Sequence, residues 1–304
     1  MITIGSRGSA LALAQTHQIR DRILSILPDE EVTVKVIRTS ADKNPTASIR
    51  LGSSIGVFVK ELEEALIAKE IDIAVHSMKD LPTATPAGLR IVAVPPREDP
   101  RDAFIATAAS RALELPPGAV VGTGSVRRQA QLLALRPDLK VADIRGNIDT
   151  RLRKLQEGAY DALILACAGL NRLGLQNRIS GVFSLAEMLP APGQGALALE
   201  TRDEESPAVA AASALNHPAT AIAVSAERRF LQRMGGGCNI PVGVYASIDG
   251  DALKIEGVVA SADGRRIVRD LVTDKSEKPN DAADALADRI LSLGGRAILE
   301  SFPS

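Results

Sequence analysis

The sequence of 304 residues has few aromatic side chains and no excess of either charge. It contains no Trp, two Tyr and five Phe, and its 36 Lys and Arg are balanced by 37 Asp and Glu. Proteins that bind single-stranded nucleic acids stack the bases on aromatic rings, and nucleic-acid binders in general carry a surplus of basic residues. We therefore expect no nucleic-acid partner, although positive charge could still be concentrated in one cleft.

Membrane-spanning runs, a secretory leader and a disulfide framework are missing as well. No apolar run reaches the length of a membrane helix, and residues 1–5 lead into a strand pattern without the basic start of a signal peptide. Two cysteines are too few for a disulfide scaffold, and the three histidines have no metal-ligand spacing. We expect a cytoplasmic protein that binds neither a membrane nor a metal ion.

The two cysteines have different surroundings. Cys167 follows the apolar run 162–166, which is typical of a buried strand. Cys238 follows three glycines, which let the backbone turn sharply and let a large group approach closely. On such a loop the chemistry of a thiol matters more than its packing. Cys238 is therefore a candidate functional residue, and an incidental cysteine in a tight turn is the alternative.

Alternating strands and helices predict an α/β fold with two similar lobes, followed by a small α+β domain. Each lobe opens with a strand, a turn of glycine and hydroxyl residues, and a helix capped by Ser9 or Ser125. Because helices separate the strands, we expect parallel sheets. The expected strands of the two lobes are 1–5, 32–38, 71–76, 119–122, 140–144 and 162–166. After residue 218 we expect a helix, three short strands joined by Asp-Gly turns, and a last helix.

Proline-rich segments set the expected domain boundaries. Residues 1–95 form the first lobe together with 196–215, because a strand that begins at residue 196 can return to it. Residues 96–195 form the second lobe. Residues 216–304 form the α+β domain that carries Cys238.

Cationic and hydroxyl residues follow the strands of both lobes. In open α/β sheets, ligands bind beyond the carboxyl ends of the strands, and helix N-termini and arginines both favour anions. The candidates are Arg7, Ser9 and Lys79 in the first lobe, and Thr123, Ser125, Arg127, Arg128, Arg145, Arg151 and Arg172 in the second. Phosphate-loop and dinucleotide glycine motifs are missing. We therefore expect a ligand that carries carboxylates.

Asp80 is the one carboxylate among these strand-end candidates, and it lies next to Lys79. A carboxylate in a cationic site can stabilise a cation or move a proton, but Asp-Leu-Pro also suits a turn. On the residues alone, both interpretations stay open. His76 ends a buried strand, and we expect it to be a hydrogen-bonded core residue or to lie just behind the site.

The ordered motifs resemble the porphobilinogen deaminase (hydroxymethylbilane synthase) family over nearly the whole chain. The matching segments are residues 4–15, 58–63, 74–82, 97–103, 122–129, 144–152, 190–196 and 236–238. The resemblance implies three domains, of which the first two are like a type II periplasmic binding protein. It also implies a dipyrromethane cofactor held by a thioether to Cys238.

The resemblance further implies a reaction and roles for the candidates. Four porphobilinogen units are added in turn with loss of ammonia, and hydrolysis releases hydroxymethylbilane from a monomeric enzyme. The six arginines match positions that bind the pyrrole acetates and propionates, while Lys79 and the hydroxyl residues, now including Ser77, match other cofactor and substrate contacts. Asp80 matches the catalytic aspartate that stabilises the cationic azafulvene left when ammonia departs.

Two positions depart from the family pattern, and two other functions compete with it. Ile55 replaces a usual basic residue in the polar stretch 40–56, which is long for a loop and predicts a lid or a disordered segment. Gly124 replaces the middle residue of a Thr-Ser-Ser-like turn. A two-lobe solute-sensing module without catalysis is one alternative. A cysteine-dependent acyltransferase is the other, and it would need a histidine such as His217 beside Cys238.

Overall fold

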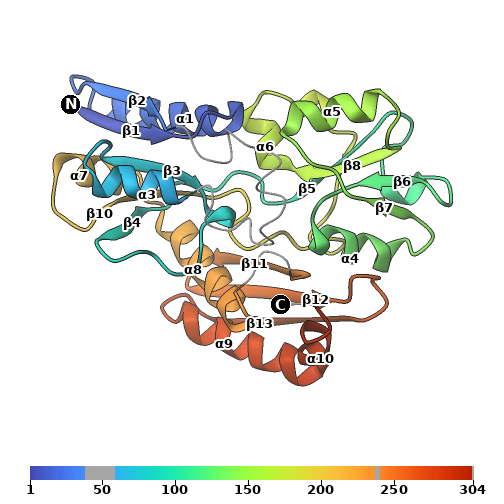
Figure 1. The fold of residues 1–304 in the computed structure, drawn as a ribbon. Coiled ribbons are helices and arrows are strands. Elements are labelled where there is room, and N and C mark those ends of the chain that lie inside the picture. Colours follow the sequence, from blue (N-terminus) through green and yellow to red (C-terminus); the bar gives the residue numbers. More distant parts are fainter. Residues whose placement is uncertain (38–58, 237–239, 303–304) are drawn as a thin grey trace. The chain divides into compact units, whose positions relative to one another are not determined.

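The computed structural model describes residues 1–37, 59–236 and 240–302 (Figure 1). The chain divides into two compact units, which are described one at a time. Unit 1 comprises Met1–Arg97 and Ala196–Ala221, and unit 2 comprises Glu98–Gly195 and Ile222–Ser304. Residues Ala196–Ala221 thus group with the N-terminal segment.

Unit 1 is built on a five-stranded mixed sheet with the order β2-β1-β3-β10-β4. Strands β1 (Ile2–Ser6), β2 (Val32–Val36) and β3 (Ile73–Ser77) are parallel. Strand β10 (Leu197–Arg202) runs antiparallel between β3 and β4 (Leu89–Ala93). The strand expected after residue 196 is therefore β10, which lies inside this sheet.

Helices cover both faces of this sheet. Helices α1 (Ala10–Ile26) and α7 (Pro207–Ser213) pack side chains such as Ile19 and Ala212 against one face. Helix α3 (Lys60–Ile67) packs Leu62 and Leu66 against the other face. This arrangement is the expected doubly wound lobe.

The first part of unit 2 repeats the plan with the strand order β7-β6-β8-β5-β9. Strands β6 (Val120–Gly122), β7 (Lys140–Ala142) and β8 (Ala162–Ala166) are parallel, with β7 at the edge of the sheet. Strand β5 (Asp102–Ala106) runs antiparallel between β8 and β9 (Gly181–Val182). Helix α4 (Val126–Leu135) covers one face, and α5 (Ile148–Gln156) and α6 (Cys167–Arg172) cover the other.

The second part of unit 2 is an antiparallel sheet covered by helices. Strands β11 (Val242–Asp249), β12 (Ala252–Ala260) and β13 (Ile267–Lys275) form a meander. Helices α8 (Pro218–Arg233) and α9 (Pro279–Ile290) pack Phe230 and Leu286 onto it, and the turn Leu291–Gly295 leads to α10 (Arg296–Leu299). The expected α+β fold of this part is confirmed, whereas the proposed division into three domains stays a prediction.

Several sequence-based expectations were wrong or incomplete. The sheets are mixed rather than parallel, because β10 and β5 enter them antiparallel. Strands β4, β5 and β9 were not expected at all, since each is short and close to proline or glycine rather than part of a strand–helix alternation. Residues 168–172, expected as a loop, belong to α6. The expected loop 40–56 lies outside the described residues.

Candidate functional site

A hollow in unit 1 gathers residues from the ends of two strands. It is a shallow hollow that opens to solvent, with a cavity volume of about 30 Å³, and it is lined by Arg7, Ala12, Gln15, Val59, Val75, His76, Ser77 and Asp80. Arg7 follows β1, and Ser77 and Asp80 lie at and just after the end of β3. The structure therefore brings three of the expected residues together at the carboxyl edge of the sheet, where the α/β rule places ligands.

Asp80 ends a single 3₁₀ turn, Met78–Asp80, which follows β3 directly. Met78 anchors the turn, because its side chain is buried and its N–H donates to the carbonyl of Ala196 at 3.0 Å. The turn closes where the N–H of Leu81 donates to the Met78 carbonyl at 3.2 Å. Asp80 is left exposed at the hollow, and the half-buried Lys79 precedes it without lining the hollow.

The hydroxyl residues of unit 1 already have partners within the protein. Ser9 caps α1, because its Oγ accepts the N–H of Ala12 at 3.2 Å. The Ser77 hydroxyl and the Gln15 amide bond to each other at 2.9 and 3.2 Å. Gln15 is buried on α1 and lines the hollow, but it was not selected from the sequence. Its place at the end of the matching segment 4–15 is the signal that could have found it.

His76 and Glu200 form a buried pair behind the hollow. Nε2 of His76 lies 3.0 Å from Oε2 of Glu200, and the two side chains are 4% and 1% exposed. Glu63, on α3, lies close enough to the pair to interact with it electrostatically. Burial, and secondly the negative charge of Glu200, raise the pKa of the Glu63 carboxyl. The expectation that His76 is a hydrogen-bonded residue just behind the site is consistent with this geometry, but its place in the lining was not foreseen.

In unit 2, Arg127 and Arg128 converge on Asp102, the first residue of β5. Asp102 is fully buried; its Oδ2 accepts Arg127 Nη1 at 2.7 Å, and its Oδ1 accepts Arg128 Nη2 at 2.8 Å and Nε at 3.0 Å. The Gln194 amide adds a hydrogen bond of 2.9 Å to Oδ1. Burial alone would raise the pKa of Asp102, but the two arginines outweigh it and hold that pKa well below its usual range.

The arginine pair was expected to face a ligand, and the structure corrects this in part. Both side chains are buried, and Arg127 and Arg128 also donate to the carbonyls of Leu189 and Ile164 at 2.7 and 3.2 Å. The sequence analysis did not select Asp102, although an aspartate that begins the apolar strand Asp102–Ala106 is a recognisable signal for a buried counter-ion. Arg127 Nε is buried and has no hydrogen-bond partner among the described residues.

The other expected residues of unit 2 lie on neighbouring turns. Oγ1 of the buried Thr123 accepts the N–H of Ser125 at 3.2 Å, and Ser125 caps α4 by accepting the N–H of Arg128 at 3.4 Å. Arg145 is exposed, and its Nε donates to Asp143 Oδ2 at 2.8 Å. Arg151 Nε donates to the Gly146 carbonyl at 2.8 Å.

Arg172 was expected in a loop, but it is the last residue of α6. Its Nη2 donates to the Gly195 carbonyl at 2.7 Å, so it holds the end of the segment 190–195 rather than standing on a free loop. Burial acts to raise the pKa of Glu98, but hydrogen bonds from the Asp99 N–H and the Asn171 amide, together with the charge of Arg172, lower it below its usual value.

The charges of this region favour an anionic ligand. Burial, and then the positive charges of Arg128 and Arg145, lower the pKa of Arg151, which shows that these cations lie near one another. Around them the paired carboxylates are Asp102 and Asp143. Four arginines against two carboxylates, together with the unpartnered Arg127 Nε, fit a group that carries carboxylates.

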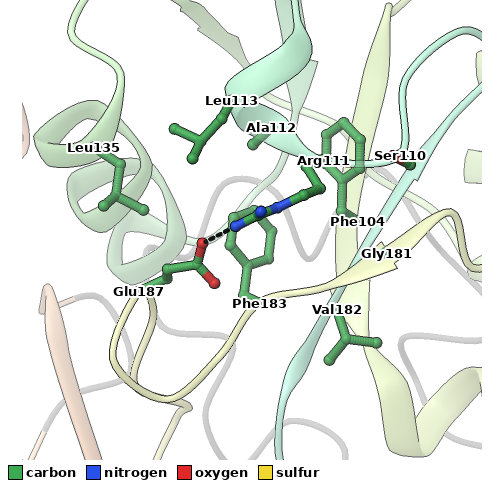
Figure 2. A pocket seen from close by; sticks show the side chains of 10 residues that line it. All are labelled: Phe104, Ser110, Arg111, Ala112, Leu113, Leu135, Gly181, Val182, Phe183 and Glu187. Atoms are coloured by element: carbon green, nitrogen blue, oxygen red, sulfur yellow. Dashed lines mark hydrogen bonds and ion pairs between the residues drawn. The ribbon is translucent and has the colours of Figure 1, made fainter.

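A second hollow in unit 2 has a different character. Figure 2 shows Leu113, Leu135 and Val182 around the pair Arg111–Glu187, with the rings of Phe104 and Phe183 close to Arg111. The two rings meet edge to face at 6.2 Å, and Arg111 Nη2 lies 3.2 Å from Glu187 Oε1. Since none of the expected site residues lines it, this hollow is not our candidate.

The two cysteines and His217 are the residues that concern cofactor attachment and the alternative of a cysteine-dependent acyltransferase. Cys238 lies outside the described residues. Cys167 is buried, and burial raises the pKa of its thiol to about 12, as suits a structural thiol. His217 Nδ1 lies 2.8 Å from the Thr220 hydroxyl and 3.3 Å from the Thr220 backbone nitrogen, so this ring caps the start of α8.

The described ranges hold neither a candidate metal cluster nor a helix that could cross a membrane. Those residues contain no cluster of three or more His, Cys, Asp or Glu side chains that could hold a metal ion. Within the same residues, every helix is too short or too polar to span a lipid bilayer.

Comparison with known proteins assigns the chain along its whole length. A family model described as porphobilinogen deaminase, dipyromethane cofactor binding domain, matches residues 2–210, and one described as porphobilinogen deaminase, C-terminal domain, matches residues 221–292. The porphobilinogen deaminase of Thermus thermophilus is 51% identical, with 98% of each chain covered. That of Thiobacillus denitrificans is 45% identical, with 100% of this chain and 99% of the relative covered.

Solved structures add little. A putative methionine-binding lipoprotein of Bacillus subtilis is 14% identical, with a TM-score of 0.43 and coverage of 71% of this chain and 90% of the other. A likeness at this level carries no argument about a ligand. The two family models and the full-length relatives are consistent with each other, and the chain belongs to the porphobilinogen deaminase family.

Proposed function

We propose that this protein is a hydroxymethylbilane synthase, which joins four porphobilinogen molecules head to tail and releases hydroxymethylbilane by hydrolysis. The match of the family models and relatives over the whole chain is the observation that carries this proposal. The hollow that Arg7, Ser77 and Asp80 line supports it, because these are the residues for which the sequence motifs predict contact with the reacting pyrroles.

The proposed cofactor is a dipyrromethane attached through a thioether to Cys238. Each of its pyrroles carries an acetate and a propionate, so it needs several cations. We assign Arg127, Arg128, Arg145 and Arg151 to these carboxylates, and the surplus of arginine over paired carboxylate fits them. When bound, the dipyrromethane supplies the free α-carbon to which the first substrate pyrrole is joined.

The other residues receive supporting roles. Arg7 and Arg172 bind carboxylates of the substrate and of the growing chain, while Ser9, Ser77, Lys79, Thr123 and Ser125 make polar contacts with cofactor or substrate. Ser9 and Ser125 also cap their helices, which fixes the two turns that carry these contacts. Thr123 further stiffens its turn through its bond to the Ser125 N–H.

Asp80 is proposed as the catalytic carboxylate. Its negative charge stabilises the cation that develops on the substrate when the C–N bond breaks and ammonia leaves. Placement on a short turn anchored by the buried Met78 suits this role, because a fixed charge costs little reorganisation during the reaction. Exposure of Asp80 at the hollow leaves it accessible to the pyrrole N–H groups.

A direct test combines activity with mass. Purified protein given porphobilinogen should release ammonia and form hydroxymethylbilane, and its intact mass should exceed the chain mass by one dipyrromethane. An acidic aldehyde reagent, which colours pyrroles, should colour the protein only when the added mass is present. A solute-sensing module would bind porphobilinogen without releasing ammonia and would carry no adduct, so this result would overturn the proposal.

The family resemblance also suggests a cytoplasmic monomer whose partners are small molecules, not a nucleic acid or a membrane. Sedimentation of the loaded protein should give the mass of one chain. A stable dimer across the working concentration range would contradict the monomer.

A further inference from the structure

One pair of side chains is not used by the function proposed above. His76 lines the same hollow as Asp80, yet its side chain is 4% exposed and its Nε2 lies 3.0 Å from Oε2 of Glu200. Glu200 is itself 1% exposed. Burying a carboxylate is costly unless it is paired, so the burial of Glu200 beside His76 suggests that the two side chains act together.

The sheet explains how the pair forms. Strand β10 runs antiparallel to β3, with Ala198 opposite His76 and Glu200 opposite Ala74. Residues two apart on a strand share a face, so Glu200 and His76 are diagonal neighbours on one face of the sheet. Ala74, on the same face, packs with the residues of α3, and Glu63 of that helix senses both members of the pair.

The pair fixes the state of the histidine ring. With Nε2 facing a carboxylate, the neutral imidazole places its proton on Nε2 and leaves a lone pair on Nδ1. In the part of the chain that the structure describes, Nδ1 of His76 has no hydrogen-bond partner. A buried imidazole with one nitrogen anchored by a carboxylate and the other unoccupied is the arrangement of a general base.

The proposed reaction releases a proton that some group must accept. Joining two pyrroles forms a bond between the methylene carbon of one and the α-carbon of the next, and that α-carbon must then lose its hydrogen. Asp80 is poorly suited to accept it, because a carboxylate that takes a proton loses the charge with which it stabilises the cation. A neutral base beside Asp80 separates the two tasks.

We propose that His76 is the proton acceptor for each chain extension and that Glu200 positions it; this inference rests on the proposed function. The C–N bond breaks with both electrons going to nitrogen, and ammonia departs. The new C–C bond forms, the α-C–H bond breaks and its electrons restore the aromatic ring. The proton passes to Nδ1 of His76 and then to the released ammonia, which leaves as ammonium, so each cycle returns the imidazole to its neutral form.

Four charged groups surround this ring. Glu200 on β10 faces Nε2, Glu63 reaches it from α3, and Arg7 and Asp80 line the hollow with it. Glu200 stabilises the imidazolium that forms on proton transfer. The raised pKa of Glu63 limits the extra negative charge that this helix adds nearby.

The test uses porphobilinogen that carries deuterium at its free α-carbon. His76→Gln keeps an amide N–H that can reach Glu200 but removes the base, and His17→Gln makes the same change at an exposed position on α1. At matched cofactor content, His76→Gln should join pyrroles about a hundredfold more slowly, and deuterium should slow it further. Wild-type protein and His17→Gln should show little isotope effect.

The outcomes separate the two proposals. If wild-type protein releases no ammonia at all, the proposed function fails. If wild-type protein works and His76→Gln joins pyrroles at the same rate without an isotope effect, the inference about His76 is wrong and the function stands. Glu200→Gln should lie between the two, with a smaller loss and a measurable isotope effect, because it leaves the ring in place but poorly oriented.

An independent readout needs no turnover. Nitrogen-15 spectra of the imidazole in the isolated protein should show Nε2 protonated and Nδ1 bare at neutral pH, and Glu200→Gln should mix the two tautomers. A proton on Nδ1 in the wild-type protein would overturn the proposal, since that nitrogen could then accept nothing.

Discussion

Replacing Asp102 with Asn removes one charge from the interior and leaves the shape almost unchanged. Asp102 is the shared counter-ion of two buried arginines, with contacts of 2.7 to 3.0 Å. An Asn can keep one acceptor oxygen, but its amide group meets a guanidinium donor. Removing one partner of a buried ion pair typically costs about 3–5 kcal/mol. For a unit of this size, that corresponds to a fall in Tm of roughly 6–20 °C.

The assay is thermal and denaturant unfolding of Asp102→Asn beside Asp138→Asn. Asp138 pairs with Arg136 at 2.6 Å in the same unit, but it is 38% exposed. Because exposed pairs contribute about 0–1 kcal/mol, the control should unfold within a few degrees of wild type. If Asp102→Asn unfolds as late as Asp138→Asn, the two arginines do not depend on Asp102 and this reasoning is refuted.

The difference in the free energy of unfolding between wild type and Asp102→Asn should depend on pH in one direction. The pKa of Asp102 is depressed in the folded protein, so its contribution is fully present above the unfolded value of about 3.9 and is lost as pH falls below it. The stability gap between wild type and Asp102→Asn should therefore stay constant from neutral pH down to about pH 4 and narrow only in stronger acid. A gap that closes between pH 7 and pH 5 would contradict the assignment.

Three further predictions concern the site and its turns. Asp80→Asn should slow single-turnover ammonia release by about a hundred- to a thousandfold, because a fixed negative charge is lost, and Asp80→Glu should be slow but measurable. Near wild-type rates in the Asp80→Asn protein would show that Asp80 is only a turn residue. Arg127→Ala should impair cofactor loading, whereas Arg172→Ala should load and stall during elongation, as native gels of bound intermediates can show; the reverse pattern would refute this division. Gly124→Ser should lower the free energy of unfolding by about 1 kcal/mol, because a Cβ there would lie 2.9 Å from Asp143 Oδ1 and 3.2 Å from the Ile144 carbonyl oxygen. An unchanged Tm would show that the Asp143 side chain can move aside without destabilising the protein.

The sequence predicts the regular parts of the fold because its local signals are consistent there. Ser9 and Ser125 cap the helices as expected, and α4 begins at Val126, directly after the Ser125 cap. Strands β4 and β5 were missed, because each depends on a partner far along the chain. β4 pairs with β10, about a hundred residues away, and no local pattern encodes that pairing.

The site was predictable in its residue types and less so in its contacts. Strand-end position led to Asp80, Arg7 and the arginines of the second lobe. It could not show that Arg127 and Arg128 share a buried carboxylate, because Asp102 lies about 25 residues earlier on a strand that was not foreseen. It could not pair His76 with Glu200 either, since only the antiparallel insertion of β10 brings the two together.

The central claim is that this chain builds its product on a dipyrromethane attached to Cys238, and the intact mass of the protein tests it most directly. Wild-type protein should carry one dipyrromethane, and a chain with Cys238→Ser should carry none, because an alcohol is a far poorer nucleophile than a thiolate for forming this link. Cys167→Ser serves as the matched control and should carry the full adduct, because its thiol is buried and its pKa is raised to about 12. A full adduct on the Cys238→Ser protein, or none on wild type, would contradict the account.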